Sequence, residues 1–191
     1  MTAYRRLRRP GGTYFFTVNL ADRDSQALVT HWPELKDAMA ATRQTHPFRT
    51  AGLVVLPDHL HAIWTLPDGD TDFSTRWRLI KSRFSRTTGF RGMRTASHRS
   101  KSELGVWQRR FWEHWIRDDR DLARCLRYCW LNPVKHGLVD RAADWPLSTI
   151  HRDIAAGRVP PDLSGEADPA FGERAARVMG GDHPSYRCRV T

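Results

Sequence analysis

Cysteine, acidic residues and long apolar runs are all scarce in this sequence, and each shortage narrows the possibilities. The three cysteines form neither an even set nor a C-x-x-C pair, which favours a reducing compartment over a disulfide-bonded, secreted protein. Cys125 and Cys129, four residues apart on a predicted helix, are expected to be buried thiols. No apolar stretch is long enough to span a membrane, and the basic first residues are not followed by the apolar core of a signal peptide. We therefore expect a cytoplasmic protein with no membrane partner.

The shortage of acidic residues leaves a strong positive charge. Lysine and arginine number 31 against 21 acidic residues, which gives a net charge of +10 and a pI near 10.4. Most of the basic residues are arginines, whose planar guanidinium can bind a phosphate through two hydrogen bonds. A nucleic acid is therefore the first partner to consider, and an anionic membrane surface is the second.

The composition is that of a folded protein with one main domain. A hydrophobic share of 40% and eight tryptophans suffice for a packed core in a chain of 191 residues. We predict a main domain at residues 1–150, with a basic N-terminal arm, and a partly irregular C-terminal tail at residues 151–191. The tail carries several Pro and Gly pairs, and we expect one short helix in it, near Phe171–Met179.

Two clusters of basic residues are candidates for phosphate contact. One is the N-terminal arm, and the other decorates a helix that begins near Asp72 or Ser74. A solvated helix face usually mixes charges of both signs, whereas no acidic residue occurs between Phe73 and Lys101. The same pattern also fits a solvated basic surface. We predict DNA contacts within both clusters, from Arg5, Arg6, Arg8, Arg9, Arg78, Lys81 and Arg83.

The most informative stretch is Leu53–Leu66, in which a Pro-Asp turn separates two β-prone runs. We predict antiparallel strands at residues 51–56 and 59–66. Side chains two apart on a strand point to the same face, so His59 and His61 are expected to project side by side. Neutral imidazole is the commonest metal ligand in proteins. Two histidines also occur at this spacing by chance, so the pair alone fits either a metal site or an ordinary strand.

The remaining patterns complete an alternating order of elements. We predict a strand at 13–20, a helix at 33–45, the two strands around the histidines, the basic helix, a flexible loop at 89–101, a strand at 106–116 and a last helix from Asp118. The first six elements match the ferredoxin-like split βαβ arrangement, an α+β fold. In that arrangement an antiparallel sheet has the histidine motif on an inner strand and two helices on one face. The additional last helix can cross the open face.

The last helix brings a tyrosine and an asparagine together. Tyr128 and Asn132 are one turn apart and therefore share a face of the helix. Pro133 disfavours helical geometry at the residue before it, so we expect the helix to end or kink at Asn132. If this helix crosses the sheet, Tyr128 and Asn132 come within reach of His59 and His61.

Four segments of the chain resemble the REP-associated tyrosine transposases, a branch of the single-tyrosine HUH transposases, where U is a hydrophobic residue. The segments follow one another in one order between Tyr4 and Thr149, and they are Gly11–Leu20, Leu56–Pro67, Phe111–His114 and Asn132–Leu138. The resemblance implies that residues 1–150 form a catalytic domain that cleaves and rejoins single-stranded or hairpin DNA at repetitive extragenic palindromes. It also implies a divalent cation and a covalent 5′-phosphotyrosine intermediate.

The resemblance further assigns roles to individual residues. It implies that Tyr128 is the nucleophile and that His59, His61 and Asn132 hold the metal. The motif after the tyrosine, Asn-Pro-Val-Lys-His-Gly, adds two candidates for DNA contact or for support of the site. These two candidates are Lys135 and His136.

The chain departs from the family pattern in two places. The family usually has an acidic residue immediately before the tyrosine, where this chain has Arg127, and the loop at Arg91–Lys101 is long. The first departure concerns how Tyr128 is tuned and not its identity. The phosphoryl chemistry also needs help from the site, because free tyrosine has a pKa near 10 and is mostly a phenol at pH 7.

A bound cation would supply part of that help by polarising a non-bridging oxygen of the phosphate. Two imidazoles and a neutral amide suit Mg²⁺ or Mn²⁺ for this task, although the ligand types alone do not exclude Zn²⁺.

Three other functions are compatible with the sequence. The first is a vestigial HUH-fold protein that binds DNA without cleaving it. The second is a relaxase or replication initiator of the HUH type, although those enzymes are usually larger and carry a partner domain such as a helicase. The third is an RNA-binding module. The sequence favours neither a monomer nor a homodimer.

Overall fold

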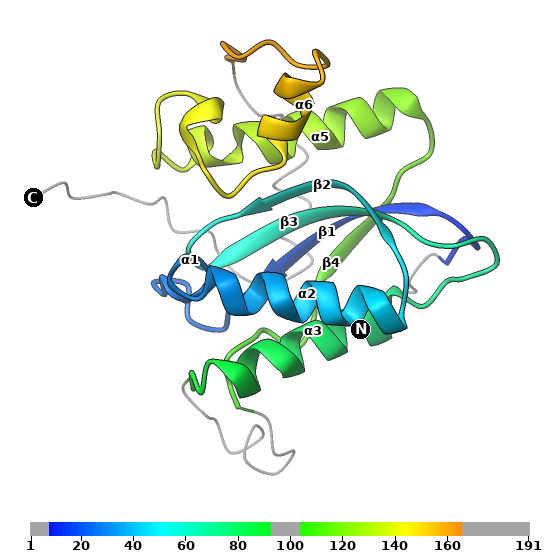
Figure 1. Ribbon diagram of the computed structural model, residues 1–191, viewed down its shortest axis with the longest axis vertical. Coiled ribbons are helices and arrows are strands. Elements are labelled where there is room, and N and C mark those ends of the chain that lie inside the picture. Colours follow the sequence, from blue (N-terminus) through cyan, green and yellow to red (C-terminus); the bar gives the residue numbers. More distant parts are fainter. Residues whose placement is uncertain (1–7, 93–103, 166–191) are drawn as a thin grey trace, which may run out of the picture.

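A four-stranded antiparallel sheet forms the centre of the computed structural model, which describes residues 8–92 and 104–165 (Figure 1). The strand order is β2-β3-β1-β4, so the strand with the two histidines is an inner one, as predicted. The strands are β1 (Thr13–Asn19), β2 (Arg49–Val55), β3 (His59–Thr65) and β4 (Trp112–Trp115).

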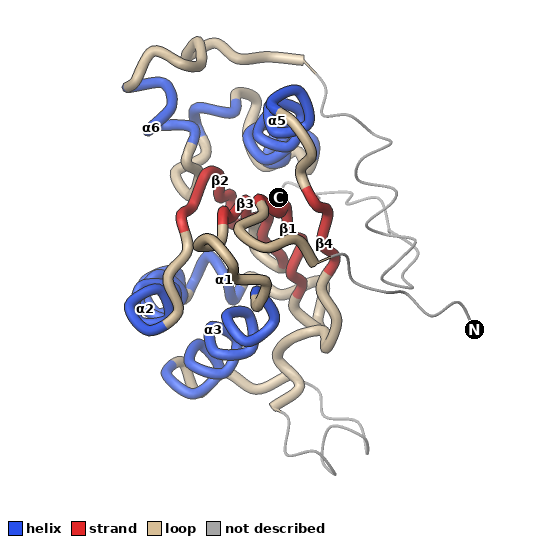
Figure 2. The backbone as a smooth tube through the Cα atoms, turned by 90° about the vertical axis from the view of Figure 1, so that its right-hand side faces the viewer, coloured by secondary structure: helices blue, strands red, loops and turns tan. Residues whose placement is uncertain are grey.

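Helices lie on both faces of this sheet (Figures 1 and 2). Helices α2 and α3 pack on one face and contact each other, whereas α5 crosses the opposite face with α6 beside it. The predicted α+β class is confirmed, with two helices on one face and an additional helix on the other. The helices are α1 (Ala27–Thr30), α2 (Trp32–Thr45), α3 (Phe73–Thr87), α5 (Asp119–Lys135), the 3₁₀ helix η1 (Ala142–Asp144) and α6 (Ile150–Ala155).

Alternation along β3 distributes its side chains between the two faces. Ala62 and Trp64 belong to the core beneath α2 and α3, whereas Ile63 belongs to the core beneath α5. Residues two apart on a strand share a face, so His59 and His61 lie with Ile63 on the α5 side. One strand therefore contributes both to an aromatic core and to the candidate site.

The face beneath α2 and α3 is an aromatic core. The Trp64 indole stacks on Trp77 of α3 with ring centroids 4.1 Å apart and an interplanar angle of 15°. Phe48 approaches the Trp64 ring to the same centroid distance of 4.1 Å, and Phe16 contacts both indoles. Aromatic side chains dominate core energetics because each removes about 150–250 Å² from water. This face therefore supplies much of the apolar burial that holds the sheet.

Helix α3 begins where its sequence predicts and is tied to its surroundings by a buried arginine. The N-cap Asp72 accepts a hydrogen bond from the Thr75 amide at 3.0 Å. The Arg76 side chain is 2% exposed, pairs with Asp70 at 2.6 Å, and donates to two carbonyl oxygens of the segment before β2. Arg76 therefore serves the fold, which separates it from the other arginines of α3.

Helix α5 is longer than the sequence predicts. We expected the helix to end or kink at Asn132, but α5 continues to Lys135 with Pro133 inside its last turn. The C-cap is His136, and Gly137 follows with a φ of +65°, a conformation that glycine adopts without strain. Proline removes one amide donor, and the burial of both Asn132 and Pro133 outweighs that local preference.

Strand β4 is shorter than predicted. The sequence favours a strand over residues 106–116, but only Trp112–Trp115 pairs continuously with β1. Trp112 lies opposite Thr17, and β1 ends two residues later, so the preceding residues have almost no strand to pair with. They form a single bridge, between Trp107 and Leu20, and turn towards α3. The short elements α1, η1 and α6 were not predicted.

The segment after α5 returns to β2 and satisfies the backbone groups on its outer edge. The Thr149 amide donates to the Leu53 carbonyl at 2.9 Å, and the Leu147 carbonyl accepts from the Val55 amide at 2.9 Å. The Trp145 indole donates to the Val55 carbonyl, also at 2.9 Å. Buried backbone groups are seldom left without partners, and here a distant segment supplies them.

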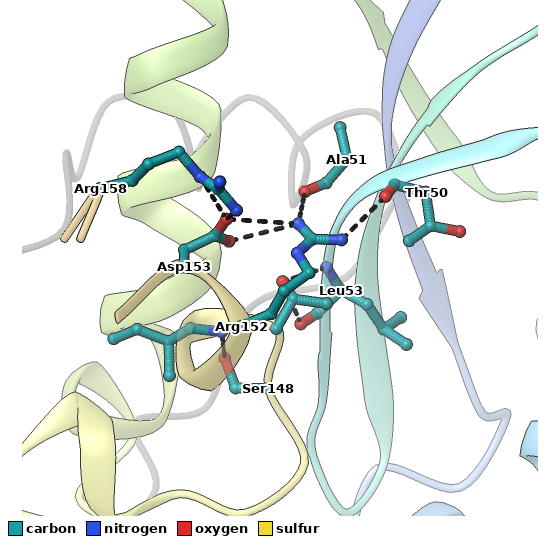
Figure 3. A network of polar contacts seen from close by, with 9 residues as sticks. Thr50, Ala51, Leu53, Ser148, Arg152, Asp153 and Arg158 are labelled. Carbon is teal, nitrogen blue, oxygen red and sulfur yellow. Dashed lines mark hydrogen bonds and ion pairs between the residues drawn. The ribbon is translucent and has the colours of Figure 1, made fainter. Parts of the chain in front are cut away.

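A network of charged residues holds α6 to the same edge (Figure 3). Arg152 donates to the carbonyl oxygens of Thr50 and Ala51 at 3.2 and 2.6 Å. The buried Asp153 pairs with Arg152 and with Arg158. Because α6 begins at Ile150, it lies across the predicted domain boundary, and the division into 1–150 and 151–191 stays a prediction.

Several predictions concern residues outside the described ranges, namely Arg5, Arg6, Phe171–Met179, Cys188 and most of the loop at 89–101. Cys125 and Cys129 are buried free thiols, as predicted. Burial raises the pKa of Cys125 to about 12, so its thiol stays protonated. Within the described residues, no helix is both long enough and apolar enough to cross a membrane.

Candidate active site

The two histidines of β3 lie side by side beneath α5. Their ring centroids are 5.0 Å apart, and the residues are 4% and 2% exposed. In β1, Asn19 lies opposite His59 and Thr17 lies opposite His61. Because β3 is an inner strand, hydrogen bonds on both sides fix the position of the pair.

Asp58 orients the first histidine. The buried Asp58 places Oδ1 2.7 Å from Nδ1 of His59, and its Oδ2 pairs with Arg23 at 2.9 Å. A carboxylate only accepts hydrogen bonds, so Nδ1 of His59 carries the hydrogen and Nε2 keeps its lone pair. Histidines that bind metals are commonly held in this way by a carboxylate.

Thr17 takes the corresponding position beside the second histidine. Its hydroxyl lies 2.9 Å from Nδ1 of His61. Burial lowers the pKa of His61 well below the ordinary value of 6.5, and the charges of His59, His136 and Lys135 lower it further. The ring is therefore neutral at pH 7. Its Nε2 is buried and has no hydrogen-bond partner among the described residues, so it can offer a lone pair to a ligand.

Asn132 lies beside these rings with both of its amide atoms unpaired. The residue is fully buried, and neither Oδ1 nor Nδ2 has a hydrogen-bond partner within residues 8–92 and 104–165. The amide approaches His61 closely enough to oppose the lowering of its pKa, although no atom pair has hydrogen-bonding geometry. An unpaired buried amide costs about 1–3 kcal/mol. Such a group beside an unpaired imidazole nitrogen indicates a ligand site.

Tyr128 packs against the same histidine. Its ring centroid is 5.2 Å from that of His61 and 5.8 Å from that of Phe15, both in edge-to-face contact. The residue is 5% exposed. Lys135 lies seven residues, or about two helical turns, further on, with Nζ 3.5 Å from the tyrosine oxygen and 5.1 Å from the ring centroid. A positive charge therefore stands next to the phenol.

The last turn of α5 also approaches the other histidine. The ring centroid of His136 lies 5.1 Å from that of His59. The structure thus brings together His59, His61, Tyr128, Asn132, Lys135 and His136. The sequence predicted a site or DNA-contact position for each of them, and four of the six come from α5 and its C-cap residue, His136.

The remaining predicted DNA contacts lie elsewhere. Arg8 and Arg9 stack on Phe73 and Trp115, with the guanidinium 5.8 and 5.0 Å from the ring centroids. Arg83 donates to the Thr42 hydroxyl at 2.7 Å and so links α3 to α2. Two further basic side chains of α3 face a groove on the opposite side of the sheet from the histidines. They are Arg78 and Lys81.

Sequence reasoning did not identify the residues that orient the histidines. Thr17 depends on the register between β1 and β3, which the sequence does not reveal. Asp58 was placed in a turn, where its contact with His59 is local and could have been anticipated from their adjacency. Arg23 was placed in a loop, and its pairing with Asp58 spans 35 positions of the chain.

A second group of possible metal ligands lies on the same face of the sheet, where β4 meets the first turns of α5. One ligand atom each from His114, Asp121 and Cys125 lies within 4.8 Å of the others. The Asp121 carboxylate, however, already pairs with His114 at 2.8 Å and with Arg124 at 2.9 Å. The ligand form of cysteine is the thiolate, which the raised pKa of Cys125 disfavours. This group therefore fits a structural network better than an ion.

Comparison with known proteins gives close relatives along nearly the whole chain. No model of a protein family matches. The chain is 46% identical over 175 residues to a REP-associated tyrosine transposase of Escherichia coli K12, covering 91% of this chain and 98% of the relative. It is 43% identical to a putative REP-associated tyrosine transposase of Haemophilus influenzae, covering 88% and 96%. A solved structure of a REP-associated tyrosine transposase bound to a REP hairpin matches with a TM-score of 0.79, at 40% identity over 100% of both chains.

Proposed function

The chain belongs to the family of REP-associated tyrosine transposases, and on that premise we propose that it cleaves and rejoins DNA at repetitive extragenic palindromes. The strand is cut by Tyr128, which becomes joined to a 5′-phosphate. The observation that carries this proposal is the contact of the Tyr128 ring with His61, beside an unpaired asparagine amide and a lysine ammonium. A phenol, a cation and buried lone pairs in one small volume suit phosphoryl transfer.

Tyr128 acts as the nucleophile in a balanced exchange. Its oxygen loses a proton and forms a bond to phosphorus, while the bond between phosphorus and the 3′ oxygen of the preceding nucleotide breaks. That 3′ oxygen takes up a proton and leaves as a hydroxyl. The number of phosphoester bonds does not change, so the 3′-hydroxyl of the same or another strand can attack the phosphotyrosine and restore a phosphodiester.

Lys135 supports both directions of this exchange. Its Nζ lies 3.5 Å from the Tyr128 oxygen, so its positive charge stabilises the negative charge that this oxygen carries when it attacks or leaves. His136 contacts His59, so it adds a polar side chain between Lys135 and the histidine pair. The last two turns of α5 therefore position both the nucleophile and its charge partner.

A divalent cation fits the donors next to Tyr128. Nε2 of His61 and the amide of Asn132 are buried and have no hydrogen-bond partner among the described residues, and Asp58 holds His59 with its Nε2 lone pair available. When bound there, Mg²⁺ or Mn²⁺ would withdraw negative charge from the phosphate that Tyr128 attacks. The three protein donors are neutral, so they leave the charge of the ion intact. This is why we propose Mg²⁺ or Mn²⁺ in preference to a structural zinc.

The DNA partner follows from the family and from the charge of the chain. A relative of this family has been solved with a REP hairpin, and we propose a single-stranded or hairpin REP-like palindrome as the substrate here. The net charge of +10 implies several phosphate contacts, each of which adds a slope of about −0.7 to log K against log salt for single strands. Arg8, Arg9, Arg78 and Lys81 are the described candidates for these contacts.

The test uses a hairpin oligonucleotide incubated with the protein and Mn²⁺, and a denaturing gel. DNA labelled downstream of the cut is expected to run with the protein, and DNA labelled upstream is expected to run free. Tyr128→Phe removes one oxygen and is expected to abolish the covalent adduct. Tyr14→Phe makes the same chemical change on the other face of the sheet and should keep the adduct.

Three outcomes would contradict parts of the proposal. An adduct in Tyr128→Phe would mean that another group is the nucleophile. An adduct on the upstream label would reverse the polarity of the phosphotyrosine. Binding of the hairpin by the wild-type protein without any adduct would support a DNA-binding protein that has lost its activity.

A further inference from the structure

The chain contains only two asparagines, Asn19 and Asn132, and both lie beside the histidines of β3. The resemblance to the family assigns a role to Asn132, on α5, but none to Asn19, on β1. Asn19 is 8% exposed, and its Oδ1 has no hydrogen-bond partner among the described residues. A buried amide oxygen without a partner lowers the stability of the fold, so it indicates a group that binds there.

Strand pairing places the Asn19 side chain on the α5 face of the sheet, next to His59. Phe15 of β1 belongs to the core beneath α5, and Asn19, four residues further along the strand, shares its face. Asn19 and His59 lie directly opposite each other. The Leu20 amide donates to the Asp58 carbonyl at 2.8 Å, so the ladder hydrogen bonds flank the pair of Asn19 and His59 and do not join it. In such a pair the Cβ atoms are only about 4.5–5.5 Å apart.

Gln108 turns the amide oxygen of Asn19 towards the histidines. Gln108 belongs to the segment before β4, which lies on the side of β1 away from β3. Its backbone amide donates to the Asn19 carbonyl at 3.0 Å, and its side-chain Oε1 accepts from Nδ2 of Asn19 at 3.3 Å. The nitrogen and the oxygen of an amide point away from each other. Because Nδ2 is held on the Gln108 side, Oδ1 of Asn19 is directed towards β3.

The chemistry of Oδ1 limits what it can bind. An amide oxygen accepts a hydrogen bond or binds a cation, and it cannot donate. The asparagine side chain is shorter than that of histidine, so Oδ1 of Asn19 lies closer to the sheet than the Nε2 atoms of His59 and His61. An ion held by those nitrogens is therefore better reached by Oδ1 through a water than directly. Mg²⁺ usually keeps several of its waters in protein sites, and each of these waters is a strong donor.

We propose that Asn19 is a positioning residue of the cation site and that its Oδ1 accepts a hydrogen bond from a water bound to the divalent cation. The inference rests on the cation of the proposed function and adds a residue to its site. Asn132 and the two histidines bind the ion, whereas Asn19 holds one of the waters that the ion keeps. The site thus favours a hydrated cation, because an ion that sheds its waters leaves the buried oxygen without a donor.

The test measures Mn²⁺ affinity of the full chain without DNA, by electron paramagnetic resonance of the free ion. Asn19→Leu keeps the volume and removes the acceptor, so it should weaken Mn²⁺ binding about tenfold, the lower end of the roughly 10–100-fold loss seen when groups that support metal ligands are removed. Asn19→Asp also loses the Nδ2 donor but keeps an acceptor, and it should bind Mn²⁺ at least as tightly as the wild type. Wild-type affinity in Asn19→Leu would overturn the proposal.

Further variants separate the role at the ion from a role in the fold. Gln108→Leu removes the partner of Nδ2 and leaves Oδ1 in place, so it should weaken Mn²⁺ binding less than Asn19→Leu does. Gln44→Leu makes the same change at an exposed position of α2 and should bind Mn²⁺ like the wild type. In EDTA the Tm of Asn19→Leu should not fall below that of the wild type. A fall in that Tm, together with equal losses of affinity in Asn19→Leu and Asn19→Asp, would assign Asn19 to the fold and overturn the proposal.

The same titration of His61→Ala distinguishes failure of this inference from failure of the proposed function. Mn²⁺ binding that is lost in His61→Ala but kept in Asn19→Leu would overturn only the role of Asn19. A wild-type protein that binds no Mn²⁺, or a His61→Ala variant that binds it fully, would overturn the cation of the proposed function and this inference with it. Adduct formation with the hairpin is scored in its own assay, so loss of strand transfer is detected independently of Mn²⁺ affinity.

Discussion

The two faces of the central sheet bury different kinds of side chain. Beneath α2 and α3, two buried indole nitrogens have no hydrogen-bond partner among the described residues, Nε1 of Trp64 and Nε1 of Trp77, and each is the single polar atom of a large apolar side chain. Beneath α5, His61 and Asn132 bury their polar atoms on small polar side chains. The first face gains stability from ring stacking, whereas the second gives up stability to keep lone pairs available.

The comparison teaches how one strand can serve both purposes. Trp64 and His61 are three residues apart on β3 and belong to opposite faces because side chains alternate along a strand. The sheet is therefore held from one side while polar groups are exposed to a ligand on the other. Functional sites often contain such locally unfavourable arrangements, compensated elsewhere in the fold.

The largest effect is expected on the α2–α3 face. Trp64→Ala removes a ring that stacks on Trp77 and Phe48, so it should lower the free energy of unfolding by about 3–5 kcal/mol. His61→Ala, on the same strand but the other face, should cost clearly less. Urea denaturation followed by far-ultraviolet circular dichroism measures both. Equal losses in the two variants would break the comparison.

The second effect should come from filling the α5 face with its ligand. An ion that binds only the folded protein stabilises it by about 2.7 kcal/mol at a concentration one hundred times its Kd. Mn²⁺ is therefore expected to raise the Tm of the wild-type protein, and EDTA is expected to reverse the rise. His59→Ala, His61→Ala and Asn132→Leu should each reduce it, and the matched variant His114→Ala should not. The opposite pattern would move the ion to the cluster of His114, Asp121 and Cys125.

A third, smaller effect is expected where α5 begins. Burial alone would raise the pKa of Asp121, but the hydrogen bonds from His114 and the Arg117 amide lower it below the ordinary value of 3.8 overall. The ionised carboxylate therefore stabilises the folded protein at neutral pH. This stabilisation is lost as the pH falls from about 3.8, the ordinary pKa of the unfolded chain, through the lower pKa that Asp121 has in the folded protein. Asp121→Asn should cost about 1–3 kcal/mol at pH 7 and remove this part of the acid dependence. The exposed Asp119→Asn, in the same helical turn, should change little.

The smallest effect is expected to have the opposite sign. Asn132→Leu replaces an amide whose polar atoms lack partners among the described residues, so in EDTA it should raise the free energy of unfolding by about 1 kcal/mol. The same variant should form no DNA adduct. Thr42→Val is the counterpart on the other face, where the hydroxyl donates to Ala38 and accepts from Arg83, and it should lower stability. A loss of stability in Asn132→Leu would mean that the amide is satisfied in solution.

Much of the fold could be predicted from local patterns. The two β-prone runs around the Pro-Asp turn gave β2 and β3 to within two residues, and the cap at Asp72 gave the start of α3. The order of elements gave the sheet with its inner histidine strand. The end of α5 was predicted too early, because the local preference of Pro133 against helix is outweighed by burial of the last turn. The strand at 106–116 was overestimated because aromatic residues favour strands, whereas pairing also requires that β1 continue alongside.

The candidate site divides in the same way. Spacing on a strand placed His59 and His61 on one face, and spacing on a helix did the same for Tyr128 and Asn132, whereas their roles came only from the resemblance to the family. Thr17 and Arg23 could not be predicted, because their roles depend on strand register and on contacts between distant segments. The groove on α3 also depends on such a contact. A Cβ at Gly92 would lie 2.0 Å from the Gly105 carbonyl oxygen. Only glycine at position 92 therefore lets the segment after α3 approach the segment before β4 so closely.

The contacts along the outer edge of β2 have a consequence for assembly. An open edge strand offers its amides and carbonyls to any passing strand, which leads to sheet extension between copies and to aggregation. On β2, Leu53, Val55 and the carbonyls before them already bond to residues 145–152. The opposite edge, β4, offers only four residues. Addition of a strand to β2 would therefore first require residues 145–152 to detach from this edge.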